Sequence, residues 1–102
     1  MATIYDARSV NPDDVTAEQL DEVFTEHGMT QAAEPIPNFF KAGTTYERGY
    51  LFRCALVGID HPRGGVPVAL GFAPINRSGE RTWEVIFLDV VDWNRDWTEV
   101  TD

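Results

Sequence analysis

Cysteine and lysine are the residues that this sequence has least of. It contains one cysteine, Cys54, and only one of its eight basic residues, Lys41, is a lysine. A single cysteine excludes a disulfide within the chain, and sparse cysteine is typical of a reducing compartment. We therefore expect a cytoplasmic protein, which for a phage-encoded chain means the host cytoplasm.

Long hydrophobic runs are also missing. The longest apolar stretches fall far short of the roughly 18 residues that a membrane span needs. The first residues, Met1-Ala2-Thr3-Ile4, have neither the basic start nor the apolar run of a signal peptide. The net charge of −9 disfavours direct contact with nucleic acid or anionic lipid. We expect no membrane partner and no direct nucleic-acid partner.

The sequence has no catalytic motif. Cys54 lies in an apolar run, which predicts a buried and inert thiol. His27 ends a helical pattern, where the helix dipole favours a structural imidazole. His61 stands beside Asp60 in a turn, and adjacent side chains rarely face one substrate, so we interpret it as an exposed loop histidine. We predict no catalytic residue and no enzyme.

Nucleotide and metal motifs are incomplete. Arg63-Gly64-Gly65 lacks the lysine and the Ser/Thr of a phosphate-binding loop. The segment 92–96 matches the first three ligand positions of a calcium loop, but Trp97 occupies the position that requires glycine. We predict no metal and no cofactor.

Apolar and aromatic residues are plentiful. Hydrophobic residues make up 43% of the 102 residues and aromatic residues 12%, enough to build a core without disulfides or metal. The sequence therefore predicts one domain over 1–102. Its acidic tail, 94–102, is either frayed or held down by Trp97.

One helix is strongly indicated over about 17–27. Thr16 and Gln19 fit a capping box, and Val15 and Leu20 fit a hydrophobic staple. Gly28 supplies the left-handed residue that ends many helices. An apolar stripe at helical spacing predicts the buried face: Leu20, Val23, Phe24 and His27.

The rest of the sequence has the pattern of an antiparallel sheet. Strands are predicted over 50–59, 66–75 and 82–93, with a short edge strand over 3–8. Tyr50, Phe52, Cys54 and Leu56 are predicted to share one face. The segment 29–48 predicts a short strand or a helical turn, with Phe39 or Phe40 in the core. The fold class is α+β, an antiparallel sheet of three to five strands with one N-terminal helix packed on one face.

Two features of the second strand need an explanation. It is the middle strand by connectivity, yet it contains Pro67 and Pro74, which cannot donate to a ladder. Either the pairing is confined to 68–73, or the third strand is central. Three small residues on one face predict that the helix or an aromatic side chain packs over them: Ala69, Gly71 and Ala73.

Negative charge is concentrated at the two ends of the chain. Residues 1–26 hold seven acids against Arg8, a balance of −6, and residues 89–102 hold five against Arg95, a balance of −4. The stretch 27–88 has five acids and six bases, a balance of +1. Segregated charge bears on partners and solubility rather than on fold. Compositional bias or adaptation to high salt is the alternative explanation of the total.

The acidic ends predict a surface that binds a basic protein. Carboxylates on the outer helix face, and carboxylates beside two tryptophans, suit an interface with arginine and lysine. The candidate partner-binding residues are Glu18, Asp21, Glu22, Glu26, Asp92, Trp93, Asp96, Trp97 and Glu99.

The leading hypothesis is a non-enzymatic inhibitor that blocks the nucleic-acid-binding surface of a basic, nucleic-acid-handling partner. Small phage counter-defence proteins of the anti-CRISPR kind and toxin-immunity proteins work in this general way, and the analogy rests on size and charge. One alternative is a structural subunit, such as a virion component, that assembles through strand edges and Phe39-Phe40. Another is a small ligand-binding domain or enzyme with a pocket near Ala69, Gly71 and Ala73. The sequence leaves the oligomeric state open.

Overall fold

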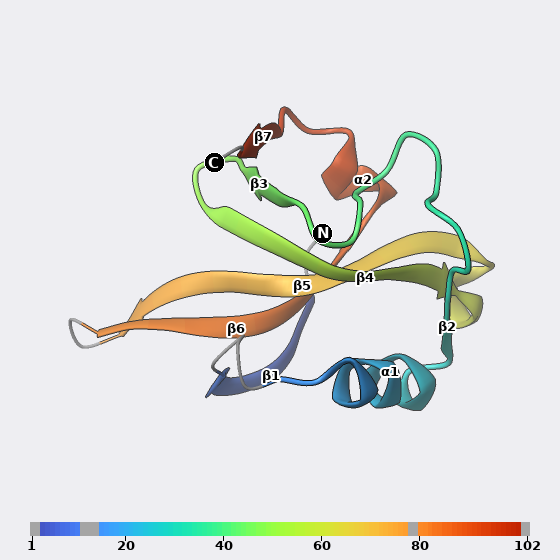
Figure 1. The fold of residues 1–102 in the computed structure, drawn as a ribbon, viewed down its shortest axis with the longest axis horizontal. Coiled ribbons are helices and arrows are strands. Elements are labelled where there is room, and N and C mark those ends of the chain that lie inside the picture. Colours follow the sequence, from blue (N-terminus) through green and yellow to red (C-terminus); the bar gives the residue numbers. More distant parts are fainter. Residues whose placement is uncertain (1–2, 11–14, 78–79, 101–102) are drawn as a thin grey trace.

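The fold is built on one antiparallel sheet with elements packed on both of its faces (Figure 1). The computed structural model describes residues 3–10, 15–77 and 80–100. In chain order its elements are β1 (Thr3–Val10), α1 (Ala17–Glu26), β2 (Met29–Gln31), β3 (Thr45–Glu47), β4 (Leu51–Asp60), the 3₁₀ turn η2 (His61–Arg63), β5 (Val66–Arg77), β6 (Glu80–Asp89), α2 (Val90–Trp93) and β7 (Thr98–Val100).

The α+β class is confirmed, but the predicted element count is too low. Six strands follow the order β1-β6-β5-β4-β3-β7, and β2 pairs with the far end of β4. The described residues also form a second α-helix, α2, besides the predicted α1. The additional strands β2, β3 and β7 have three residues each, which is too short to show a hydrophobic period in the sequence.

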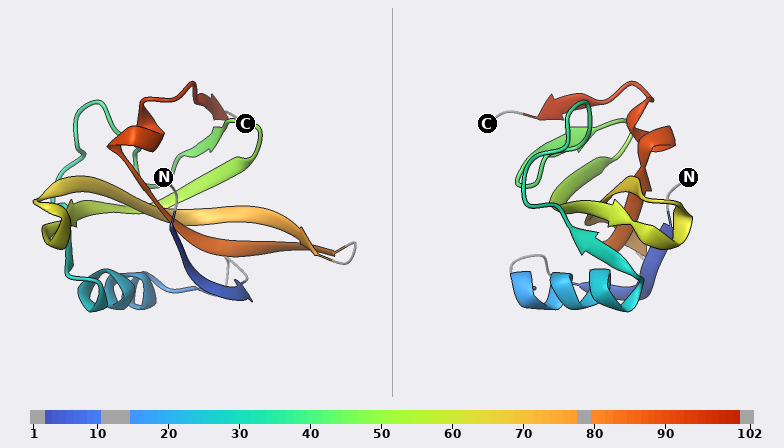
Figure 2. Two further views of the ribbon diagram at one scale, coloured as in Figure 1. Left: turned by 180° about the vertical axis from the view of Figure 1, so that it is seen from behind. Right: turned by 90° about the vertical axis from the view of Figure 1, so that its right-hand side faces the viewer.

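Two hydrophobic clusters lie on opposite faces of β4, β5 and β6. One contains Leu20 and Phe24 of α1 together with Leu70 and Phe87 of the sheet. The other is rich in aromatic side chains and is covered by the 36–46 segment, α2 and Trp97. Figure 2 shows α1 on one side of the sheet and the layer of β3, β7 and α2 on the other.

The predicted start and end of α1 are confirmed. The Gln19 backbone N–H donates to Thr16 Oγ1 at 3.2 Å, and the Thr16 N–H donates to Gln19 Oε1 at 2.8 Å. This reciprocal pair satisfies two N–H groups that a helix start leaves without partners. Gly28 has φ +74°, the left-handed conformation expected just after a helix.

A β-bulge in β4 corrects one predicted face. Cys54 pairs with Gly71 and Leu56 pairs with Leu70, so Ala55 is the extra residue on β4. The bulge reverses the alternation, and Leu56 therefore joins the α1 cluster while Phe52 and Cys54 join the aromatic cluster. The prediction that Leu56 shares their face was wrong for this reason.

The positions of the two prolines show why β5 can be a middle strand. Pro67 lies opposite Ile59 of β4, before the pairing with β6 begins at Val68. Pro74 lies opposite Trp83 of β6, beyond the last residue paired with β4, Phe72. Each proline therefore sits where β5 has a neighbour on one side only, and the missing N–H breaks no two-sided ladder.

The third predicted strand ends earlier than expected. β6 stops at Asp89, and Val90–Trp93 form α2. The Asp92 N–H donates to Asp89 Oδ1 at 3.2 Å, while the Asp89 N–H donates to Asp92 Oδ2 at 3.1 Å. This second capping box turns the chain out of the strand, so the prediction of strand to residue 93 was wrong.

Aromatic rings anchor the two segments whose structure the sequence left open, 29–48 and the tail from residue 94. Phe39 and Phe40 are buried, as predicted for the 29–48 segment. The tail is held down by Trp97, whose ring centroid lies 5.4 Å from that of Phe40. The Trp97 Nε1–H donates to the Asp92 carbonyl at 2.7 Å, and β7 pairs with β3. Residues 101–102 of the predicted tail lie outside the described residues.

Candidate functional site

The outer face of α1 presents the first predicted acidic surface. Leu20 and Phe24 turn inward, while Glu18, Asp21, Glu22 and Glu26 are exposed. Within the part of the chain that the structure describes, Glu18, Asp21 and Glu22 form no ion pair. The last turn of α1 contains no basic residue. Glu18, Asp21 and Glu22 therefore carry negative charge that no ion pair among the described residues neutralises.

The second predicted surface is less uniform. Asp96 and Glu99 are exposed. Asp92 is only 6% exposed, because its carboxylate caps the start of α2. Trp93 and Trp97 are half-buried, and both rings pack against Phe40. The structure thus gives these three residues structural contacts, and leaves Asp96 and Glu99 as the carboxylates of this surface that face solvent.

The two acidic surfaces do not form one continuous surface. α1 packs on one face of the sheet, and α2 with β7 lies on the other (Figure 2). Glu22 and Glu99, for example, belong to layers separated by the sheet.

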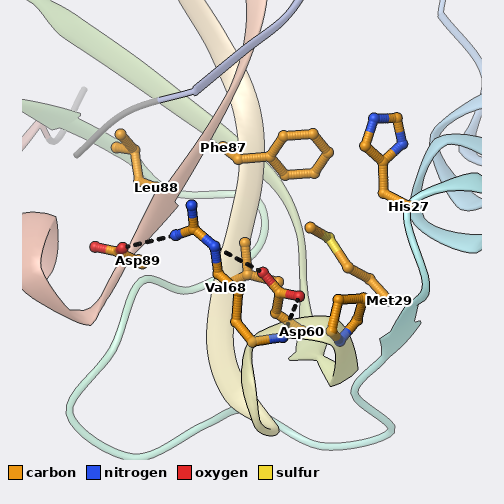
Figure 3. A pocket seen from close by; sticks show the side chains of 9 residues that line it. His27, Met29, Asp60, Val68, Phe87, Leu88 and Asp89 are labelled. Atoms are coloured by element: carbon orange, nitrogen blue, oxygen red, sulfur yellow. Dashed lines mark hydrogen bonds and ion pairs between the residues drawn. The ribbon is translucent and has the colours of Figure 1, made fainter.

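A cavity of about 220 Å³ lies next to the end of α1 (Figure 3). Five elements or their ends meet there: α1, β2, the β4–η2 junction, β5 and β6. Its walls are largely apolar. The lining residues are His27, Met29, Asp60, Pro62, Arg63, Val68, Phe87, Leu88 and Asp89.

Three charged side chains meet at the polar side of this cavity. Arg63 Nη1 lies 3.5 Å from Asp89 Oδ2, and Arg63 Nε lies 3.9 Å from Asp60 Oδ2. Each aspartate uses its other oxygen as a cap: Asp60 Oδ1 accepts the Arg63 N–H at 3.3 Å, and Asp89 Oδ1 accepts the Asp92 N–H. Capping fixes both carboxylates, so the Oδ2 atoms are held in place toward the guanidinium.

Asp89 is ionised at neutral pH. Partial burial raises the pKa of its carboxyl group, but the hydrogen bond from the Asp92 backbone N–H, a nearby positive charge and further hydrogen bonds together outweigh burial and lower the pKa overall.

His27 lines the cavity on the side opposite Asp89 (Figure 3). Its Nδ1 lies 3.1 Å from the Val23 carbonyl, and its ring centroid lies 5.6 Å from that of Phe87. The backbone contact fixes the ring at the helix end, as expected for a structural histidine.

The predicted burial of Cys54 and exposure of His61 are confirmed. Cys54 is buried, and burial raises the pKa of its thiol to about 12, so the thiol stays protonated at neutral pH. His61 is exposed in η2, where its Nε2 lies 2.9 Å from Thr30 Oγ1.

The small-residue face carries core rather than a pocket. Phe52 packs over Gly71, where an added Cβ would lie 2.7 Å from the ring. Ala69 and Ala73 are buried in the same aromatic cluster. The aromatic cover predicted for this face is confirmed, and the space that the pocket hypothesis requires is filled. Phe39 and Phe40, suggested as assembly contacts, are buried in this cluster as well.

Within 3–10, 15–77 and 80–100, no three His, Cys, Asp or Glu side chains are arranged to hold a metal ion. Over the same residues, no helix has the length and hydropathy needed to cross a bilayer.

Comparison of the chain with protein-family models, with curated proteins and with solved structures finds no match. The surfaces and the cavity are therefore the features of the molecule that indicate a function. Sequence reasoning missed the cavity because Asp89 and Phe87 come from a strand far along the chain from Asp60. The one local signal was Asp60 three residues before Arg63, which is typical of a capped turn.

Proposed function

We propose that this protein is a non-enzymatic binding domain that docks a basic protein on the outer face of α1. The observation that supports the proposal is the exposure, on one helix, of Glu18, Asp21 and Glu22, which form no ion pair among the described residues. Such a surface attracts a basic partner over a distance of about a Debye length and speeds association. The opposite face of α1 is buried in the core, which holds the charges in a fixed array.

The spacing of the carboxylates along α1 can be compared with the spacing of phosphates along DNA. Glu18 and Glu22 are four residues apart, about 6 Å along the helix axis. Phosphates of one DNA strand recur about every 3.4 Å along the duplex axis. These two carboxylates therefore have the sign of DNA phosphates at roughly half the linear charge density of one DNA strand. This supports occupation of a basic groove by carboxylates in place of phosphates, as proposed for a phage counter-defence or toxin-immunity protein acting in the cytoplasm.

Three double variants with equal charge change test the proposal. Asp21→Lys/Glu22→Lys alters α1, Asp96→Lys/Glu99→Lys alters the second acidic surface, and Glu34→Lys/Glu47→Lys is the control at exposed sites elsewhere. Each double variant changes the net charge from −9 to −5. Differences among them therefore report the position of the charge rather than its total.

The assay is an affinity pull-down from source extract between about 50 and 200 mM salt, with duplex DNA as competitor. We expect a basic protein that wild type retains, that salt and DNA displace, and that the α1 variant loses while the control keeps it. Retention by the α1 variant equal to that by the control would refute docking on α1. Loss of the partner only in the Asp96/Glu99 variant would indicate that the docking surface lies on the other face of the sheet.

A further inference from the structure

A second cavity, also of about 220 Å³, lies across the sheet from α1, beside β3, β7 and α2 (Figure 1). We call it the Tyr46 cavity. Its lining residues are Asn38, Phe39, Lys41, Tyr46, Trp93 and Glu99. A few polar groups on an aromatic wall are typical of a site for a small molecule. The volume lies below the roughly 300 Å³ at which pockets for drug-sized molecules begin, so the ligand must be small.

The aromatic walls of the Tyr46 cavity meet at steep angles. The Trp93 ring is inclined at 88° to that of Tyr46, with 5.9 Å between the centroids. It is inclined at 57° to the ring of Phe39, with 6.2 Å between the centroids. The Tyr46 hydroxyl accepts the Lys41 backbone N–H at 2.9 Å, which holds the ring in position. An aromatic face attracts a cation that lies within about 6 Å of its centroid, so these walls suit a positively charged group.

Two opposite charges lie near the two ends of the Tyr46 ring. Glu99 of β7 pairs directly with Tyr46 of β3, so the two side chains project from the same face of this strand pair. Lys41 lies at the other end of the ring, where its backbone N–H meets the hydroxyl. Both charged side chains are exposed, and neither forms an ion pair among the described residues. The cavity therefore offers a carboxylate and an ammonium group to a ligand.

Asn38 lines the cavity in a backbone conformation that few residues adopt. Its φ is +54°, and within the part of the chain that the structure describes it is the only residue other than glycine with a positive φ. Asparagine tolerates this region better than most residues, and such conformations are concentrated at functional sites. The turn at Asn38 adds an amide to the lining, and an amide can donate a hydrogen bond to a carboxylate.

We propose that the Tyr46 cavity binds a small zwitterion of the betaine class, with a methylated ammonium group and a carboxylate. The ammonium group would lie against Tyr46 and Trp93 beside Glu99, because aromatic faces and a carboxylate both attract positive charge. The carboxylate would face Lys41. A primary ammonium group needs acceptors for three N–H groups, which aromatic walls do not supply, so a methylated one fits better. This proposal goes beyond docking on α1 and does not depend on it.

The probe is glycine betaine, and the readout is the indole Nε1–H resonance of Trp93. The resonance of Trp83, which packs against the cluster on the α1 side, is the internal control. We expect saturable shifts at Trp93 and none at Trp83. Two isosteres each lack one charge: tert-butylacetate lacks the cation and choline lacks the carboxylate. Each should bind about threefold to tenfold more weakly than betaine, because it loses one charged contact.

Two single variants assign the charges to the two ends of the ligand. Glu99→Gln should weaken the binding of betaine and choline about threefold to tenfold, but not that of tert-butylacetate. Lys41→Gln should weaken the binding of betaine and tert-butylacetate by a similar factor, but not that of choline. Glu47→Gln and Arg48→Gln remove the same charges at exposed sites outside the cavity and should bind betaine as wild type does.

Equal losses in Glu99→Gln and in Glu47→Gln would overturn the proposal, since the effect would then be one of total charge. Betaine that binds no more tightly than both isosteres would overturn it, as would equal shifts at Trp83 and Trp93 or the lack of a saturable shift. Glycine that binds as tightly as betaine would overturn the choice of a methylated ammonium group. Asp21→Lys/Glu22→Lys alters only α1 and should bind betaine as wild type does, so failure of this cavity and failure of α1 docking are distinguishable.

Discussion

Asp60 and Asp89 end strands that are not neighbours, yet both carboxylates face the guanidinium of Arg63. β5 lies between β4 and β6, and Asp60 pairs with Val66 while Asp89 pairs with Val68. The first residues of β5 thus set the two carboxylates on either side of one strand. The arrangement depends on register, so any change that shifts β5 also disturbs the cavity.

The capping box of α1 is expected to contribute measurably to stability. Thr16→Ala removes the acceptor for the Gln19 N–H and should lower the free energy of unfolding by about 1 kcal/mol. Thr16→Ser keeps the hydroxyl and should remain within a few tenths of a kcal/mol of wild type. Urea unfolding followed by circular dichroism measures both. Equal losses in the two variants would show that the hydroxyl has no capping role.

Gly71 should tolerate no side chain. A Cβ there would lie 2.3 Å from the Arg53 carbonyl oxygen and 2.7 Å from the Phe52 ring. Gly71→Ala is therefore expected to cost about 1–3 kcal/mol or more, because both neighbours are held in the sheet. A lower urea midpoint with an unchanged slope is the expected result. A midpoint equal to that of wild type would contradict the close packing of Phe52 on this strand.

Trp97 should control the attachment of β7. Trp97→Phe keeps a ring among the aromatic side chains but loses the hydrogen bond to the Asp92 carbonyl, at a cost of about 1 kcal/mol. Trp97→Ala also removes the ring contacts and should cost more, about 2 kcal/mol or above. Amide hydrogen exchange at Thr98–Val100 should accelerate in the order wild type, Phe, Ala. Unchanged exchange in the Ala variant would show that strand pairing alone holds β7.

The stability of the fold should fall in alkali, in part through Cys54. Burial raises the pKa of its thiol from 9.0 to about 12 in the folded state. The unfolded chain therefore loses this proton first as the pH rises, and the stabilising effect, complete below pH 9, is lost as the pH approaches 12. Buried Tyr46 has a raised pKa for the same reason and acts in the same direction.

Urea unfolding between about pH 8 and pH 11 measures this dependence, because one pKa unit corresponds to about 1.4 kcal/mol. Cys54→Ala should start from a lower stability and lose less of it with pH than wild type does. Identical pH slopes would show that the thiol is not protected by burial.

The helix and the long strands could be predicted because their signals are local. Thr16, Gln19 and Gly28 mark both ends of α1 within a few residues, and alternation marks β5 and β6. The bulge at Ala55 could not be predicted, since the apolar run of β4 suits both faces and its alternation does not show an inserted residue. α2 had a local signal, the spacing of Asp89 and Asp92, which was hidden by the strand-like Val90-Val91 between them.

Of the candidate sites, too, the one with a local signal could be predicted and the one formed by distant residues could not. The exposure of Glu18 and Glu22 follows from helical periodicity, so the sequence was sufficient for that surface. The cavity depends on contacts between Arg63 and Asp89, which only strand order and register bring together. Sequence reasoning also placed the two acidic ends without relating them, and the sheet that separates them is a property of the whole fold.

Pro67 and Pro74 have a consequence for how this protein behaves at high concentration. Each lies where β5 has a ladder partner on one flank only, and an unpaired flank is where a foreign strand would add by backbone hydrogen bonds. Proline offers no N–H to such a strand. The two prolines, which are unfavourable in a central strand, therefore limit the addition of a foreign strand at the unpaired flanks of β5.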